Sequence, residues 1–162
     1  MQEVVTAPEE LLTNWILKKF DELDARELYA ILQLRNEVFV VEQHCVFQDA
    51  DDKDAGCFHL MAWQAGKLAS YARIAPPGEL YPHASIGRVV TSPSFRRHGL
   101  GKELMKRSLK VIENIFGPVP VTLGAQLYLE KFYTGLGFQQ TGPVYLEDGI
   151  EHIEMSRPPV TA

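Results

Sequence analysis

Hydrophobic and polar positions along the chain follow two different periods, and each period predicts one kind of element. Short apolar runs rich in β-branched and aromatic residues predict strands, whereas apolar residues about 3.6 positions apart predict amphipathic helices. The predicted strands cover residues 15–20, 57–64, 67–75, 86–91, 119–124, 138–145 and 150–156. The predicted helices begin after Asp24, at Leu100 and near Gln126. With no internal repeat or linker, this order indicates a single mixed α/β domain over residues 1–162, in which residues 1–13 can be a flexible extension.

The first predicted helix contains one residue that does not suit its surroundings. Asp24 and Glu27 have the spacing of a capping box, which starts a helix. The apolar face that follows includes Arg35 in its middle. Because an unpaired buried charge is very costly, Arg35 must have a partner, either a carboxylate of the protein or an acceptor substrate.

The loops are marked by turn residues and by one acidic cluster. Gly66 predicts a hairpin between the second and third strands, and Glu147-Asp148-Gly149 predicts another between the last two. Gly117-Pro118 ends the helix that begins at Leu100. The four aspartates within residues 49–54 are interpreted as a solvated loop, with attraction of a cationic amine as the alternative.

Composition narrows the classes of function. A chain of 162 residues with 46% hydrophobic and 23% charged residues is typical of a globular domain. A net charge of −5 argues against a dedicated nucleic-acid binder. Residues 1–12 lack a basic segment of the secretory kind, and no apolar run approaches the roughly 18 residues that span a bilayer. We therefore expect a cytoplasmic protein that binds neither nucleic acid nor membrane.

The two cysteines predict reduced thiols and not a disulfide framework. Cys45 and Cys57 lack C-x-x-C spacing. A zinc site built from both cysteines and His59 is disfavoured, because no fourth ligand has a recognisable spacing. We expect no metal.

The most informative motif is Arg96-Arg97-His98-Gly99-Leu100-Gly101, at the join between a predicted strand and a predicted helix. A helix N-terminus offers unpaired backbone N–H groups, and glycine lets a phosphate approach them closely. No glycine lies five residues before Gly101, and residue 103 is Glu, so the motif is not the P-loop of NTPases. It also lacks the third glycine of the dinucleotide fingerprint. The remaining pattern is [RQ]-x-x-G-x-G.

With this pattern the chain resembles the GNAT superfamily of acyl-CoA-dependent N-acyltransferases, whose turn of this form holds the pyrophosphate of coenzyme A. A second family signature is present in order as the strand Val121–Leu123, then Tyr133, then Gly137-Phe138. Further segments are similar to the ElaA-type branch of the family: residues 34–43, 86–90, 123–126 and 148–153.

The resemblance implies the GNAT fold and the place of the donor. The fold would be a twisted, mixed, mostly antiparallel sheet of six or seven strands with a V-shaped split, flanked by about four helices. Pantetheine amides would pair with the backbone at Val89 and Val90, and the pyrophosphate would meet the turn. The implied contacts of the turn are Arg96, Arg97, His98, Gly99, Leu100, Gly101 and Lys102. Gln126 stands where many members have Asn, and the resemblance implies that it contacts pantetheine.

The chemistry can be argued from pKa values. An alkyl amine with a pKa of about 10.4 is protonated at neutral pH, so its acylation needs a base or a proton wire. The departing thiolate needs a proton, and the resemblance places Tyr133 as the acid that supplies it. The candidate bases are Glu42, Asp51, His59 and His152, with a water-mediated route as the alternative. The candidate acceptor contacts are Arg35, Arg88 and Asp51.

We therefore expect an acetyl-CoA-dependent N-acetyltransferase that transfers the acetyl group directly to a primary amine of a small molecule or peptide. No covalent intermediate is needed, so neither cysteine is assigned as a nucleophile. Two alternatives stay open. One is a non-catalytic acyl-CoA-binding sensor or scaffold, and the other is an acyltransferase like the acyl-homoserine lactone synthases. The family often forms homodimers.

Overall fold

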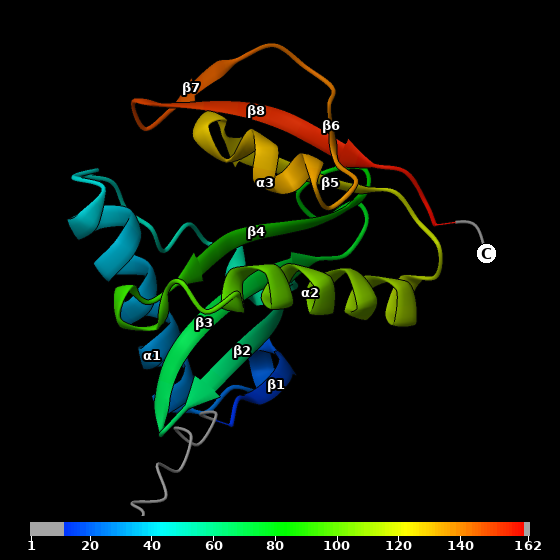
Figure 1. The fold of residues 1–162 in the computed structure, drawn as a ribbon. Helices are drawn as coiled ribbons and strands as arrows, with labels where there is room; N and C mark the ends of the chain where they lie inside the picture. Colours follow the sequence, from blue (N-terminus) through cyan, green and yellow to red (C-terminus); the bar gives the residue numbers. More distant parts are fainter. Residues whose placement is uncertain (1–11, 161–162) are drawn as a thin grey trace, which may run out of the picture.

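The computed structural model describes residues 12–160, so the expected N-terminal extension lies almost wholly outside the described residues. These residues form one eight-stranded sheet with strand order β1-β2-β3-β4-β5-β8-β6, and β7 pairs with β8 beside β6 (Figure 1). All pairs are antiparallel except β4 with β5. The strands are β1 (Asn14–Lys19), β2 (Phe58–Gln64), β3 (Lys67–Ala75), β4 (Ala84–Thr91), β5 (Val121–Gln126), β6 (Gln139–Gln140), β7 (Tyr145–Glu147) and β8 (Ile150–Arg157).

Helices cover both faces of the sheet. The α-helices are α1 (Ala25–Arg35), α2 (Leu100–Phe116) and α3 (Glu130–Thr134), and the short 3₁₀ segments are η1 (Phe20–Glu22), η3 (Asp54–Gly56), η4 (Pro93–Phe95) and η5 (Leu127–Leu129). In β3, Tyr71 belongs to the core under α1, whereas its neighbour Ala72 belongs to the core under α2. Successive side chains of a strand point to opposite faces, so a strand covered on both faces is apolar throughout.

The first helix starts as predicted but does not continue as an α-helix. The Asp24 carboxylate accepts a hydrogen bond from the Glu27 amide at 2.8 Å, and the Glu27 carboxylate accepts one from the Asp24 amide at 3.0 Å. After Arg35 the chain forms the π-helical segment η2 (Asn36–Glu42). The amides of Gln43 and Cys45 bond to carbonyls five residues earlier. Apolar spacing does not distinguish this widened turn from an α-helix, so the sequence did not show it.

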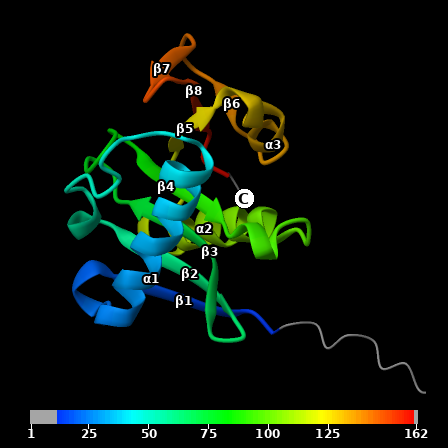
Figure 2. The same ribbon diagram turned by 90° about the vertical axis from the view of Figure 1, so that its left-hand side faces the viewer.

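The split between β4 and β5 is the feature that positions the site. The two strands pair only at Ala84 with Val121 and at Ser85 with Thr122. Beyond Ser85 the strands separate, and residues 86–91 of β4 have no strand partner on that edge within the described chain. In both views β5, β8 and α3 diverge from β4 and the strands beyond it (Figure 2). The expected V-shaped split is confirmed.

Two predicted elements at the C-terminal end are shorter than expected. The helix predicted over residues 126–136 is the 3₁₀ segment η5 followed by the five-residue α3. The strand predicted over residues 138–145 is divided into β6 and β7, with Gly142-Pro143 between them. Proline cannot donate to a sheet, so it interrupts the pairing. This break gives eight strands where six or seven were expected.

Among residues 12–160 there is no helix both long and apolar enough to cross a membrane.

Candidate functional site

A cavity of about 1110 Å³ opens where β4 and β5 separate. Its walls come from both halves of the sheet, from η2, from the loop before α2, from α3 and from the turn between β7 and β8. Of the residues predicted to take part in the site, it brings together Glu42, Asp51, Arg88, Val89, Val90, Arg96, Arg97, Gly99, Leu100, Gly101, Lys102, Gln126, Tyr133 and His152. Three predicted residues, Arg35, His59 and His98, do not line it.

The glycine turn forms the N-terminus of α2. Gly99 is the N-cap residue with φ of 74°, and Arg97 also has a positive φ of 73°. Left-handed backbone of this kind favours glycine at position 99. A Cβ on Gly101 would make only an ordinary contact of 3.7 Å with Thr91 Oγ1, so the fold alone does not require glycine there. The open backbone of this turn, at the start of a 17-residue helix, fits an anionic group.

The unpaired edge of β4 supplies a second backbone feature. Its residues 86–90 line the cavity, including Val89 and Val90. An extended molecule with amide groups can pair with such an edge as an added strand does. A long ligand could therefore place its amides on β4 and its phosphates on the glycine turn.

Arg96 is held in the described structure by Glu42. The two guanidinium NH groups donate to the two carboxylate oxygens at 3.1 and 2.8 Å, and Arg96 Nε donates to the Thr91 carbonyl at 3.1 Å. Both side chains are partly exposed. Glu42, predicted as a candidate base, is thus placed beside the glycine turn as the ion-pair partner of Arg96.

Two neighbours of Glu42 also bridge the cavity. The side chains of Gln43 and Gln126 exchange hydrogen bonds of 3.4 and 3.2 Å, so Gln126 at the end of β5 is tied to the end of η2. The Cys45 thiol donates to the Asp148 carbonyl in the β7–β8 turn at 3.5 Å. Residues 42–45, called the strap below, therefore connect both halves of the split sheet.

Tyr133 lies on α3 with only 6% of its surface exposed, but it lines the cavity. Phe132 and Phe138 contact its ring in edge-to-face geometry at 5.1 and 6.0 Å between centroids. Burial, reinforced by the neighbouring Tyr128, raises the pKa of Tyr133 to about 12. The phenol therefore stays protonated at neutral pH and can donate a hydrogen bond or a proton to an anion in the cavity.

His152 faces the same cavity from β8. Its Nδ1 lies 2.7 Å from the Ile150 carbonyl oxygen. Because a carbonyl only accepts, Nδ1 carries a hydrogen, so in the neutral form of the ring the lone pair is on Nε2. Glu147 Oε2 lies 3.8 Å from Nε2, and the Tyr145 ring stacks on the imidazole at 5.7 Å. This arrangement leaves Nε2 able to accept a proton.

A network of three arginines and three aspartates borders the cavity. Arg35 Nε donates to Asp49 at 2.7 Å, and its NH1 donates to Asp54 at 2.7 Å. Arg73 donates to Asp51 at 2.8 Å and to Asp54 at 3.0 Å. Arg88 Nε lies 2.9 Å from Asp49, and its NH2 donates to Asp51 at 3.2 Å. The solvated-loop interpretation of these aspartates was therefore wrong for all but Asp52, because the other three neutralise arginines.

Two candidate bases have properties that make them poor proton acceptors for an acceptor amine. Burial disfavours the charge on Asp51, but hydrogen bonds and charge from Arg73, the Lys53 amide and Arg88 outweigh it and lower the pKa to about 2. His59 is 1% exposed and bonds to Tyr71 Oη at 2.6 Å and to the Asp54 carbonyl at 3.0 Å. Burial lowers the pKa of His59. His59 lies outside the cavity lining, so the structure does not support it as a base.

Arg35 and Arg88 have different surroundings. Arg35 has no exposed surface and does not line the cavity. Of the two partners considered for it, the structure therefore supports a carboxylate of the protein and not a ligand. Arg88 lines the cavity from β4 with φ of 49°, beside a bulge in the pairing with β3. Positive φ in a residue other than glycine is uncommon and costs free energy, and such residues cluster at functional sites.

The sequence interpretation missed several cavity residues. Tyr81, Glu147 and Asp148 line the cavity from the loop before β4 and from the β7–β8 turn, and Arg73 lines it from β3. Loops carry no periodicity that reveals their direction, so Tyr81 gave no signal. A charged residue inside the apolar run of residues 67–75 was a usable signal for Arg73, by the argument applied to Arg35.

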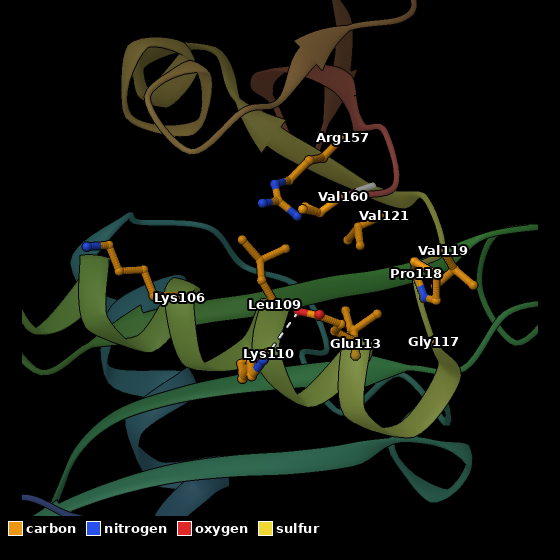
Figure 3. A pocket seen from close by; sticks show the side chains of 11 residues that line it. Lys106, Leu109, Lys110, Glu113, Gly117, Pro118, Val119, Val121, Arg157 and Val160 are labelled. Atoms are coloured by element: carbon orange, nitrogen blue, oxygen red, sulfur yellow. Dashed lines mark ion pairs between the residues drawn. The ribbon is translucent and has the colours of Figure 1, made fainter. Parts of the chain in front are cut away.

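A second, smaller cavity of about 190 Å³ lies between the C-terminal half of α2 and the start of β5 (Figure 3). Lys106, Lys110 and Arg157 stand around an apolar floor that includes Leu109 and Val121. Gly117 lines it at the C-terminal end of α2, but its lining includes neither a helix N-terminus nor the open edge of β4, and Lys110 is paired with Glu113 at 3.6 Å. The larger cavity is therefore the candidate site.

Known proteins match the chain over most of its length. Residues 24–158 match the family model described as acetyltransferase (GNAT) domain. The UPF0039 protein C11D3.02c of Schizosaccharomyces pombe is 42% identical over 144 residues, which are 88% of this chain and 95% of that protein. Protein ElaA of Escherichia coli is 39% identical over 153 residues, which are 93% of this chain and 100% of ElaA.

Solved structures agree with this result. The crystal structure described as an acyl-CoA N-acyltransferase from Pseudomonas aeruginosa has a TM-score of 0.87 and 44% identity, covering 90% of this chain and 99% of that one. The crystal structure of Escherichia coli ElaA has a TM-score of 0.85 with the same coverage. The chain therefore belongs to the GNAT acetyltransferase family and, within it, to the ElaA-like proteins.

Proposed function

We propose that the protein transfers an acetyl group from acetyl-CoA directly to a primary amine in a ternary complex. The observation that carries this proposal is the open edge of β4 running into the glycine turn at the start of α2, both on one cavity. This geometry suits a ligand with amides followed by phosphates, as in coenzyme A. The family supports acyl transfer from an acyl-CoA, and acetyl as the acyl group is part of the proposal.

The arrangement of β4 and the glycine turn supports the following proposed donor contacts. The pantetheine amides pair with Val89 and Val90, and the pyrophosphate meets the backbone amides of residues 97–102. Arg96 and Arg97 add positive charge, and His98 contributes its backbone only. Gln126 reaches pantetheine only by giving up or sharing its bonds with Gln43.

Two side chains carry the proton transfers. Deprotonating an alkyl ammonium at neutral pH costs about 4–5 kcal/mol, and His152 Nε2 is the base in the cavity that can accept this proton. Tyr133 gives its proton to the departing thiolate. A phenol with a raised pKa is a weaker acid than free tyrosine, so we assign it to protonation as the C–S bond breaks and the sulfur becomes basic.

The cysteines support direct transfer. Burial raises the pKa of Cys57 to about 11, and its thiol donates to the Lys53 carbonyl at 3.2 Å. The thiolate is the nucleophilic form of cysteine, so Cys57 is a poor nucleophile. Cys45 is bonded in the strap. Two free buried thiols also suit the cytoplasm, where we propose the protein acts.

Two measurements test the donor and the reaction separately. Acetyl-CoA at 100 times its Kd should stabilise the fold by about 2.7 kcal/mol, which is measured as a rise in Tm. Release of free thiol from acetyl-CoA in the presence of amines distinguishes an enzyme from a sensor. No stabilisation at millimolar acetyl-CoA contradicts the donor site, and stabilisation without thiol release for any amine favours the sensor.

Tyr133→Phe tests the acid. The substitution removes only the hydroxyl from a buried ring, so we expect kcat to fall about 100-fold with the Kd of acetyl-CoA nearly unchanged. Tyr29→Phe is the matched control, because Tyr29 is exposed on α1 and does not line the cavity. An unchanged kcat in Tyr133→Phe removes Tyr133 from this role.

A further inference from the structure

Two tyrosine hydroxyls converge on Gly124 of β5. A Cβ at Gly124 would lie 2.6 Å from Tyr145 Oη and 3.4 Å from Tyr81 Oη. Gly124 and Tyr81 line the cavity, and Tyr145 stacks on His152, which pairs with Gln126 two residues after Gly124. The absence of a side chain at Gly124 is therefore what admits the two hydroxyl groups at this point of β5.

The surrounding chain is acidic. Residues 138–156 contain Glu147, Asp148, Glu151 and Glu154 and no lysine or arginine. Glu147 and Asp148 line the cavity, and Glu147 lies 3.8 Å from His152 Nε2. Burial, followed by the charges of Glu147 and Glu154, raises the pKa of Tyr81, so its hydroxyl stays neutral and can accept a hydrogen bond. Neutral hydroxyls and carboxylates together suit an ammonium group.

The opposite wall offers little to a carboxylate. Arg73 and Arg88 line the cavity from β3 and β4, but Asp49, Asp51 and Asp54 already pair with them. Lys53 also lines the cavity, at an exposed position of the loop before η3. Arg73 and Arg88 are therefore committed to the protein, whereas the carboxylate of Glu147 faces the cavity.

We propose that Tyr81, Tyr145, His152 and Glu147 form the acceptor subsite, and that it takes a cationic alkylamine without a carboxylate near the amine. This assignment rests on the proposed function and names its substrate class. Tyr81, Tyr145 and Glu147 hold the ammonium, and Glu147 also stabilises the imidazolium that forms on His152. The β7–β8 turn, which directly follows Glu147, is fixed to the opposite wall by the bond from Cys45 to Asp148.

The proton transfers balance in this subsite. The ammonium gives one proton to His152 Nε2, and the freed lone pair forms the C–N bond at the thioester carbonyl. As the C–S bond breaks, Tyr133 protonates the sulfur. The second proton leaves the nitrogen and returns through water to Tyr133, and the imidazolium proton goes to solvent. The products are the acetamide, coenzyme A and one proton.

Three acceptors of matched length test the substrate class: butylamine, 1,4-diaminobutane and 4-aminobutanoate. Thiol release is followed at saturating acetyl-CoA. We expect kcat/KM for the two amines without a carboxylate to exceed that for 4-aminobutanoate by about tenfold or more, because like charges facing each other are disfavoured. Preference for 4-aminobutanoate overturns the proposal.

Glu147→Gln tests the subsite, with Glu151→Gln as the matched control. Both substitutions remove one negative charge from the same hairpin, but Glu151 is exposed and, as the strand neighbour of His152, points to the opposite face of β8. We expect Glu147→Gln to raise KM for butylamine about three- to tenfold and to leave the Kd of acetyl-CoA unchanged. Glu151→Gln should change neither value.

Each outcome of this experiment decides a different point. If both variants raise KM equally, the effect comes from the general negative charge of the hairpin, and the proposed subsite is wrong. An unchanged KM in Glu147→Gln also contradicts the proposed subsite. Bound acetyl-CoA without thiol release for any of the three acceptors refutes the acceptor class and leaves the donor site standing. Absence of acetyl-CoA binding refutes the proposed function itself.

Discussion

Asp51 keeps its charge in acid where a free aspartate loses it. Its pKa is lowered to about 2 from 3.8, because the bonds and charges of Arg73 and Arg88 outweigh the cost of burial. The folded state therefore binds this proton less tightly than the unfolded state does. It follows that Asp51 contributes stability that is present above about pH 4 and is lost as the pH falls toward 2.

Asp51→Asn should accordingly show a pH-dependent loss of stability. At neutral pH the variant lacks the ion pairs and unfolds at lower urea than the wild type, and the difference shrinks as the pH falls from about 4 to about 2. The measurement is the free energy of unfolding at several pH values. Asp52→Asn is the control, since Asp52 is exposed, lies outside the ion pairs of residues 12–160 and has φ of 64°, which asparagine tolerates. A difference that grows in acid contradicts the argument.

For Arg35, the sequence predicted that the side chain has a partner but not which residue the partner is. A charge on an apolar helix face required a partner, and the structure supplies Asp49 and Asp54. Which carboxylates would reach it could not be predicted, because loop residues 49–54 have no period that fixes their direction. The same limit concealed Tyr81 and Glu147 in the cavity.

At the scale of elements, the two glycines of the glycine turn have different roles: the fold requires one of them, and the proposed ligand requires the other. Gly99 has φ of 74°, so Gly99→Ala should lower the free energy of unfolding by about 1 kcal/mol. Gly101 has room for a Cβ, so Gly101→Ala should leave stability nearly unchanged and weaken acetyl-CoA binding by blocking the approach to the backbone. Urea unfolding and calorimetry measure the two effects.

Gly66→Ala provides the control for that pair. Gly66 has φ of 73° in the β2–β3 turn, and no atom lies within 4 Å of the place that a Cβ would take, so the substitution costs stability and touches no ligand. Its acetyl-CoA affinity should equal that of the wild type. If Gly66→Ala weakened acetyl-CoA binding as much as Gly101→Ala does, the loss of affinity in Gly101→Ala would be a consequence of lower stability and not of a blocked backbone.

Long periodic elements were predicted well, and short or irregular ones were not. The strands of the N-terminal half and α2 agree with their patterns because each packs apolar side chains against one or both hydrophobic cores. Apolar spacing predicts that the first helix continues as an α-helix through η2, because the widened turns of η2 depend on packing and not on that spacing. Strands β6 and β7 were joined in the prediction, because two and three exposed residues carry no alternation.

For the molecule as a whole, the sequence indicated the proposed donor half of the site but not the proposed acceptor half. The turn at residues 96–101 is continuous in sequence, so a motif reveals it. The proposed acceptor side is assembled from the loop before β4, from β7 and from β8, which meet only in the folded protein. The contacts of the strap could not be predicted from the sequence for the same reason, since Glu42, Gln43 and Cys45 each contact a different distant segment of the chain.

The arginine–aspartate network joins α1, the loop before η3, β3 and β4, so its loss should affect the whole fold. Arg35→Met leaves Asp49 buried without its main partner, and we expect a loss of about 3–5 kcal/mol in the free energy of unfolding. Arg26→Met is the control on the same helix, where Arg26 is exposed and a change within about 0.5 kcal/mol is expected. If Arg35→Met lowered the free energy of unfolding no more than Arg26→Met does, the network would not stabilise the fold.

The neutrality of this network has a consequence for how the sequence can diverge. Three positive and three negative side chains share their partners, so replacing one leaves an opposite charge uncompensated in the interior. A typical domain is stable by only about 5–15 kcal/mol, so such single steps are close to the limit that a fold tolerates. Paired replacements that remove one charge of each sign avoid this barrier. Over evolutionary time the six positions should therefore change as coordinated pairs, while the exposed residues around them drift independently.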